Sequence, residues 1–175
     1  MHFPFVFANL TPEVRAHMAA EVAYDQAHGG VYLNKRLSHA GQSAYPKLLA
    51  AAVESGDNQT LLASLDLDRH FYPEQGRDGS TVPLPVSAVE TYIYGEWNKF
   101  YMRGLCAYAI EQGLPQLEIY RARQSAVQPS LESRALVGTL VNPDATLSEL
   151  RANFNRHVLG KPNSGLSLRI PIQKK

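Results

Sequence analysis

The chain has 175 residues, of which 45% are hydrophobic and 19% are charged. This composition is typical of a globular protein with a buried core and excludes a disordered chain. No apolar run approaches the roughly 18 residues that a membrane-spanning helix needs, so we expect no membrane partner. The single cysteine, Cys106, excludes an intrachain disulfide and a thiolate zinc cluster, which indicates a reducing, cytoplasmic setting.

The formal net charge of +1 conceals an uneven distribution along the chain. Residues 1–115 contain 8 basic and 12 acidic side chains, a net charge of −4, and residues 116–175 contain 9 and 4, a net charge of +5. A basic C-terminal third could meet an anion, a nucleic acid or the acidic face of a second copy. Chance segregation of charge in a small domain explains the same numbers equally well.

Helical patterns dominate the first part of the chain, after a short apolar lead. The lead, "MHFPFVFANL", lacks the basic start and the cleavage site of a signal peptide, so we predict an ordered strand or arm. Thr11-Pro12 is a typical helix start and Gly29-Gly30 a typical helix stop. These signals predict a first helix between them.

Two further helices are predicted after an extended segment over residues 31–37. Ser43 precedes the second helix, "AYPKLLAAAVES", which Gly56 ends. Asp57 is a good cap for a third helix over residues 58–67. The short connection between these two helices predicts an αα-hairpin.

A long central helix is the main predicted element. Ser87 and Glu90 fit a capping box, and Gly113 with Pro115 supplies a stop. The prediction is a helix over about residues 88–112, roughly 37 Å long at 1.5 Å per residue.

After this helix the pattern changes to shorter elements. Alternation of apolar and polar residues predicts strands over residues 116–123, 134–141 and 166–172. Thr146 and Glu149 fit a capping box, which predicts one more helix over residues 147–158. Because helices come first and a small sheet comes last, the predicted fold class is α+β, in a single domain over residues 1–175. The proline- and glycine-rich loop 68–85 divides it into possible subregions, 1–67 and 86–175.

The central helix is apolar nearly all round, which predicts burial by several neighbours or by another subunit. We predict an interface at Trp97, Phe100, Tyr101 and Gly104. A glycine inside a helix costs about 1 kcal/mol relative to alanine. Gly104 therefore predicts the close approach of a neighbouring element, with ligand contact as the less favoured alternative.

Four arginines form the second predicted site, for an anionic ligand. Arg121 and Arg123 alternate along one predicted strand, and Arg169 lies on the last strand. Arg103 of the central helix is the fourth, and Tyr120 could border the group. Guanidinium groups suit carboxylates and phosphates. The alternative, which the residue types favour, is an ordinary solvent-facing side of a sheet.

No catalytic set is recognisable. The six histidines are scattered, without the spacing of metal ligands. Cys106 lies in an apolar helix, where a buried thiol is usually inert. We therefore predict no catalytic residue, no metal and no cofactor, and we leave open whether the protein is an enzyme.

Three stretches of the sequence carry a resemblance. "YGEWNKFYMRGLC", "LEIYRAR" and "SLESRALVG", within residues 90–141, look similar to small uncharacterised proteins of bacteriophages and mobile elements. The resemblance implies a role in a virion, in assembly or in host interaction, and a place in the virion if the protein is phage-encoded.

Three hypotheses for function follow. The first is a non-enzymatic structural or interaction protein that self-associates, as a homo-oligomer, or docks on a larger assembly. The second is an enzyme or binding protein that uses the arginines for an anionic small molecule. The third is weak binding of a nucleic-acid backbone by the basic C-terminal third, which predicts steep salt dependence.

Overall fold

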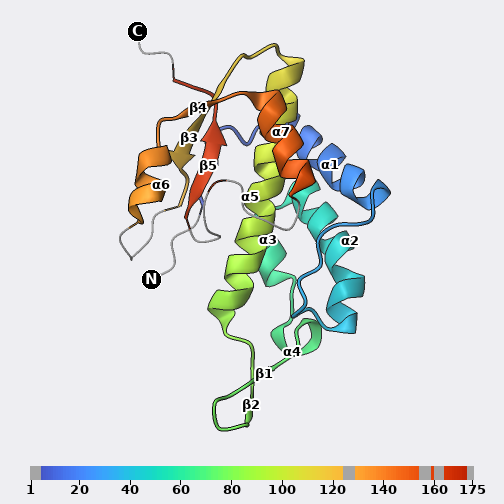
Figure 1. The fold of residues 1–175 in the computed structure, drawn as a ribbon. Coiled ribbons are helices and arrows are strands. Elements are labelled where there is room, and N and C mark those ends of the chain that lie inside the picture. The colour runs from blue at the N-terminus through green and yellow to red at the C-terminus, as the bar shows by residue number, and fades with distance from the viewer. Residues whose placement is uncertain (1–4, 124–128, 154–158, 160–163, 173–175) are drawn as a thin grey trace. The chain divides into compact units, whose positions relative to one another are not determined.

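The computed structural model describes residues 5–123, 129–153, 159 and 164–172. The fold is α+β, as predicted: helices prevail before the long central helix α5 (Val86–Glu111), and a small three-stranded sheet follows it (Figure 1). The other elements are α1 (Pro12–Ala27), α2 (His39–Ser55), α3 (Asn58–Ala63), α4 (Leu67–His70), β1 (Glu74–Gln75), β2 (Thr81–Val82), β3 (Leu117–Arg121), α6 (Leu131–Leu136), β4 (Leu140–Val141), α7 (Pro143–Ala152) and β5 (Leu166–Arg169).

The chain divides into two compact units. Unit 1 comprises residues 1–21 and 98–175, and unit 2 comprises residues 22–97. The predicted boundary loop, 68–85, lies wholly within unit 2 and contains the end of α4 and the β1–β2 hairpin. The divisions fall inside α1 and α5 instead. Unit 2 has 5 basic and 9 acidic side chains, a net charge of −4, whereas unit 1 has 12 and 7, a net charge of +5.

Two helices of unit 2 differ from the prediction, one at its start and one at its end. The second helix begins at His39 rather than after Ser43, because the side-chain oxygen of Ser38 accepts the N–H of Gly41 at 3.1 Å. Pro46 lies inside this helix, not at its start. Asp57 caps α3 as predicted, but α3 ends at Ala63 and a separate short helix, α4, follows.

The predicted capping box of α5 is wrong, although the helix itself is confirmed. The helix begins at Val86, and the amides of Ala88 and Val89 bond to the carbonyl of Pro85, so Ser87 lies inside the first turn. Its end agrees with the prediction, since α5 stops at Glu111 and Gly113 follows with φ 65°. That left-handed conformation favours glycine.

Unit 1 contains the sheet, in the order β4-β3-β5 with antiparallel pairs. The strand predicted over 134–141 is wrong for its first part, because Ser130 caps α6 and only Leu140–Val141 is a strand. The helix predicted over 147–158 begins earlier, at Pro143, because the side chain of Asn142 caps it. Its predicted last residues, 154–158, lie outside the described residues.

Within the described ranges, no helix combines the length and apolar character needed to cross a membrane.

Candidate functional site

Arg103 belongs to a buried ion cluster within unit 1. Its Nε lies 2.8 Å from Oε2 of Glu21 on α1, and its side chain is fully buried. Arg151 of α7 approaches the same carboxylate, with Nε 3.0 Å from Oε2 and Nη2 2.5 Å from Oε1. One carboxylate thus holds two guanidinium groups, and Arg103 faces an acidic residue of the chain itself rather than an open anion site.

The electrostatics of this cluster favour the charged form of Glu21. Burial alone would raise the pKa of the carboxyl group, but hydrogen bonds from Arg151 and Arg103, with their positive charges, lower it below its ordinary value. Glu21 is therefore a carboxylate at neutral pH. The carboxylate is therefore a counter-ion for the fully buried guanidinium of Arg103.

The sheet separates Arg169 from Arg121. In the register of β3 and β5, Glu118 is opposite Arg169 and Arg121 is opposite Leu166. Side chains directly opposite each other share a face, and residues 118 and 121 lie on alternate faces of β3. Arg169 and Arg121 therefore lie on opposite faces of the sheet, which does not fit one anion site built from both. Arg169 instead makes a two-pronged ion pair with Glu118, at 2.7 and 3.1 Å.

The other two arginines also contact groups of unit 1. Nη1 of Arg121 donates to the carbonyl oxygen of Ser164 at 2.6 Å. The guanidinium of Arg123 lies over the ring of Phe5, 5.8 Å from its centroid. Each of the four arginines thus contacts a different group of the chain, and the four guanidinium groups do not form one anion-binding site. Binding of an anion by any one of them stays a prediction.

The predicted interface residues of α5 lie inside the chain. Trp97, Phe100 and Tyr101 are each 0% exposed, so they present no surface to a partner. At Gly104, an added Cβ would lie 2.8 Å from the backbone nitrogen of Met18 on α1. The close approach predicted from this glycine is confirmed, and the approaching element is a helix of the same unit.

An N-terminal segment of residues 5–11, which we call the arm, lies against α5 and β3 in unit 1. Phe5 forms a bridge with Arg123, and the amide of Val6 donates to the carbonyl of Ala122 at 2.7 Å. Alternate residues face inward, because Phe5 is 9% exposed and Val6 is 68% exposed. The arm is thus ordered, as the sequence predicted, with its first residues paired to β3 and a turn at Ala8 and Asn9.

Two tyrosine hydroxyls hold the backbone of the arm. The hydroxyl of Tyr120 donates to the carbonyl of Val6 at 2.6 Å and accepts the amide of Ala8 at 3.0 Å. The hydroxyl of Tyr101 accepts the amide of Asn9 at 3.1 Å. These bonds involve only main-chain atoms of the arm, at Val6 and in the turn at Ala8 and Asn9, so they do not depend on the side chains of these residues.

The side chains of the arm add specificity. The ring of Phe7 stacks on Phe5, with centroids 5.4 Å apart, and packs on Tyr101 at 4.6 Å. The side-chain oxygen of Asn9 accepts the amide of Ile170, just after β5, at 2.9 Å. We call the set Tyr101, Tyr120, Ala122, Arg123 and Ile170 the arm-binding surface.

The ion pair on the sheet supports this surface. The guanidinium of Arg169 lies 5.4 Å from the ring centroid of Tyr120 while it binds Glu118. Burial raises the pKa of Tyr101 and of Tyr120 above the ordinary tyrosine value. Both hydroxyls therefore keep their protons at physiological pH, so that Tyr120 can donate to Val6.

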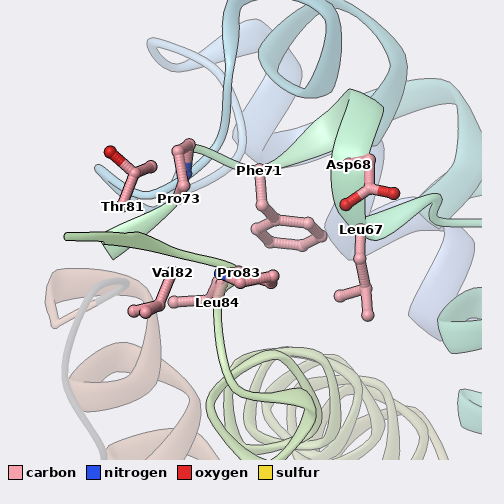
Figure 2. Close-up of a pocket in the computed structure, with 8 residues that line it drawn as sticks. All are labelled: Leu67, Asp68, Phe71, Pro73, Thr81, Val82, Pro83 and Leu84. Atoms are coloured by element: carbon pink, nitrogen blue, oxygen red, sulfur yellow. The ribbon is translucent and has the colours of Figure 1, made fainter. Parts of the chain in front are cut away.

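Unit 2 contains a separate pocket beside the β1–β2 hairpin, with a volume of about 220 Å³. Figure 2 shows the ring of Phe71 between Leu67 and the side chains of Pro83 and Leu84. The remaining lining residues are Asp68, Pro73, Thr81 and Val82. The wall is mainly apolar and carries a single carboxylate, so it offers no set of groups for acid–base or nucleophilic chemistry.

The described residues offer little reactive chemistry elsewhere. Burial raises the pKa of Cys106 to about 12, so its thiol stays protonated and inert. Within the described part of the chain, no group of three or more His, Cys, Asp or Glu side chains could hold a metal ion.

Sequence reasoning missed Glu21 and Arg151, although one signal was present. Glu21 lies on the buried stripe of α1 with Val14 and Met18, at helical spacing. A buried carboxylate is costly unless a cation pairs with it, so its position on an apolar stripe could have predicted a buried partner such as an arginine. Which arginine it meets could not be inferred, since residues 21, 103 and 151 are far apart in the sequence.

Comparison of the chain with protein-family models, with curated proteins and with solved structures finds no match.

Proposed function

We propose that the protein is a non-enzymatic interaction protein that associates with further copies of itself or docks on a larger assembly. The observation that carries the proposal is the charge of the two units, −4 for unit 2 and +5 for unit 1. Opposite charges on different parts of one chain favour a heterologous contact, in which unit 2 of one copy meets unit 1 of the next. Such contacts build rings or filaments.

The alternative of an anionic ligand has less support. Arg103 and Arg169 are each paired with a carboxylate of the chain, and a ligand would have to displace Glu21 or Glu118. Binding of a nucleic-acid backbone remains open to unit 1 through its net positive charge, and the resemblance to phage proteins is compatible with an assembly role. A mobility-shift assay at low salt tests nucleic-acid binding directly.

Light scattering over a series of protein concentrations tests self-association. At about 10 mM salt the Debye length is roughly 30 Å, whereas at 1 M it is about 3 Å. We expect the mean mass to rise with protein concentration at low salt and to fall again at high salt. A mass of one chain under all these conditions would refute self-association.

Two single substitutions give the test a matched control. Glu54 of unit 2 and Glu132 of unit 1 are both exposed carboxylates on helices. Glu54→Gln makes the acidic unit less acidic and should weaken association. Glu132→Gln makes the basic unit more basic and should leave association equal or stronger. Equal weakening by both variants would contradict a contact between opposite charges.

A further inference from the structure

The contacts of the arm are of the kind that also hold a bound peptide. It joins the rest of unit 1 through Leu10 and Thr11, directly before α1. Its contacts include main-chain hydrogen bonds to tyrosine hydroxyls and to Ala122, the side-chain bond of Asn9, and the packing of two phenylalanine rings. Main-chain bonds that give affinity, with alternate side chains that give specificity, are the features of strand-type peptide recognition.

We propose that the arm-binding surface is an intermolecular docking site whose partner is the arm of a second copy of this chain. Every contact that the arm makes within its own unit can be made identically by the arm of another copy, because the two sequences are the same. Exchange of an identical element is a low-cost route to association, since no new surface has to evolve.

The connection between the arm and α1 makes this exchange feasible. The chain turns back at Ala8 and Asn9, and the amide of Thr11 donates to the carbonyl of Asn9 at 2.8 Å. Pro12, the first residue of α1, disfavours helical backbone at Thr11. The helix therefore begins after Thr11, and this tight turn is the connection that must open in an exchange.

Exchange between unaltered copies rests on the proposed self-association, whereas recognition of the arm by the surface does not. A segment on a short flexible connection has an effective concentration in the millimolar range at its own site. The arm of another copy competes only when copies are held together at a similar local concentration. An assembly built by contacts between oppositely charged units would provide that condition.

A mixing experiment in 1 M salt tests the recognition step without the charge-driven contact. One variant lacks residues 1–9 and so has an empty surface. The other keeps its arm but carries Tyr101→Phe and Tyr120→Phe, which remove both hydroxyls that hold the arm. We expect each variant alone to have the mass of one chain and the equimolar mixture to form a two-chain species.

A peptide gives the quantitative readout of the same step. A labelled peptide of residues 1–11 should bind the arm-less variant, as measured by fluorescence anisotropy, and should bind the full chain at least ten-fold more weakly because its own arm competes. No binding of peptide or partner to an arm-less variant with a native circular-dichroism spectrum would overturn the proposal.

Cysteine cross-linking covers the case in which the arm-less variant does not fold. Phe5 and Arg123 are directly paired, so a copy with Phe5→Cys should form a disulfide with a copy carrying Arg123→Cys when both are mixed at about millimolar concentration under mild oxidation. The buried, inert Cys106 does not compete. Lys47→Cys on the exposed side of α2 is the control partner. Equal cross-linking of Arg123→Cys and Lys47→Cys copies would refute arm exchange.

Discussion

Replacing Glu21 by glutamine should destabilise the protein strongly, because the substitution removes a carboxylate that pairs with a fully buried guanidinium. Arg103 is 0% exposed and has Oε2 of Glu21 at 2.8 Å, whereas the side chain of Arg151 is 33% exposed. Arg151 can turn towards water at little cost. Arg103 cannot, and breaking a buried ion pair on one side costs about 3–5 kcal/mol.

Urea denaturation followed by far-UV circular dichroism measures the effect. With a slope of about 2 kcal/mol/M, a loss of 3–5 kcal/mol lowers the midpoint by roughly 1.5–2.5 M. The matched control is Glu111→Gln, since Glu111 pairs with His17 but its side chain is 62% exposed. That variant should change the free energy of unfolding by no more than about 0.5 kcal/mol.

The pH dependence gives an independent check. Glu21 has a lowered pKa in the folded protein, so its stabilisation is fully present above the unfolded-state pKa, near 4.5, and is lost as the pH falls through the folded-state value. The difference between the wild-type chain and Glu21→Gln should therefore be constant at neutral pH and should shrink in acid. A Glu21→Gln midpoint equal to that of Glu111→Gln at pH 7 would refute this account of the cluster.

Three further predictions concern α5. Gly104→Val should lower the free energy of unfolding by about 1–3 kcal/mol in urea denaturation, because its Cβ would meet the backbone of Met18; a variant as stable as the wild type would show that the helices separate easily. Asn98→Ala should lower the melting temperature by roughly 4–12 °C in calorimetry, because its amide donates to the Leu166 carbonyl at 2.8 Å and its oxygen accepts the Ser167 hydroxyl at 2.6 Å. Cys106 should not react with a thiol reagent at pH 8 in the folded protein but should react fully in denaturant; rapid reaction in the fold would contradict its burial.

Local signals in the sequence predicted the elements that depend on local chemistry. The start of α1 at Pro12 and the stop of α5 at Gly113 follow from backbone constraints that one or two residues impose. The misplaced start of α2 shows the limit of such signals. Ser38 and Ser43 are both acceptable caps by residue type, and the hydrogen bond of Ser38 to the carbonyl of Arg69 selects the first through a tertiary contact.

The candidate sites were harder to predict because they depend on pairings between distant segments. The alternating pattern placed Arg121 on a strand correctly. Which residue of β5 lies on the same face as Arg121 depends on the register of the two strands, and this register pairs Glu118, not Arg121, with Arg169. Likewise, the aromatic character of Tyr101 was evident, yet its hydrogen bond to Asn9 joins residues 92 positions apart. The apolar character of the central helix indicated that it is buried. The arginines, however, were predicted as an anion site, and the ion pairs of Arg103 and Arg169 with carboxylates required the structure.

The division of the chain into units has a consequence for its synthesis. Unit 2 is one continuous stretch, so it can fold as soon as residues 22–97 have left the ribosome. Unit 1 is discontinuous, and its central strand, β3, gains β5 only after Leu166–Arg169 have been made. During that interval the β5 edge of β3 would be exposed in the nascent chain, although Tyr101 and Tyr120 could already hold the arm. Pulse proteolysis of stalled nascent chains would reveal protection of unit 2 well before that of unit 1.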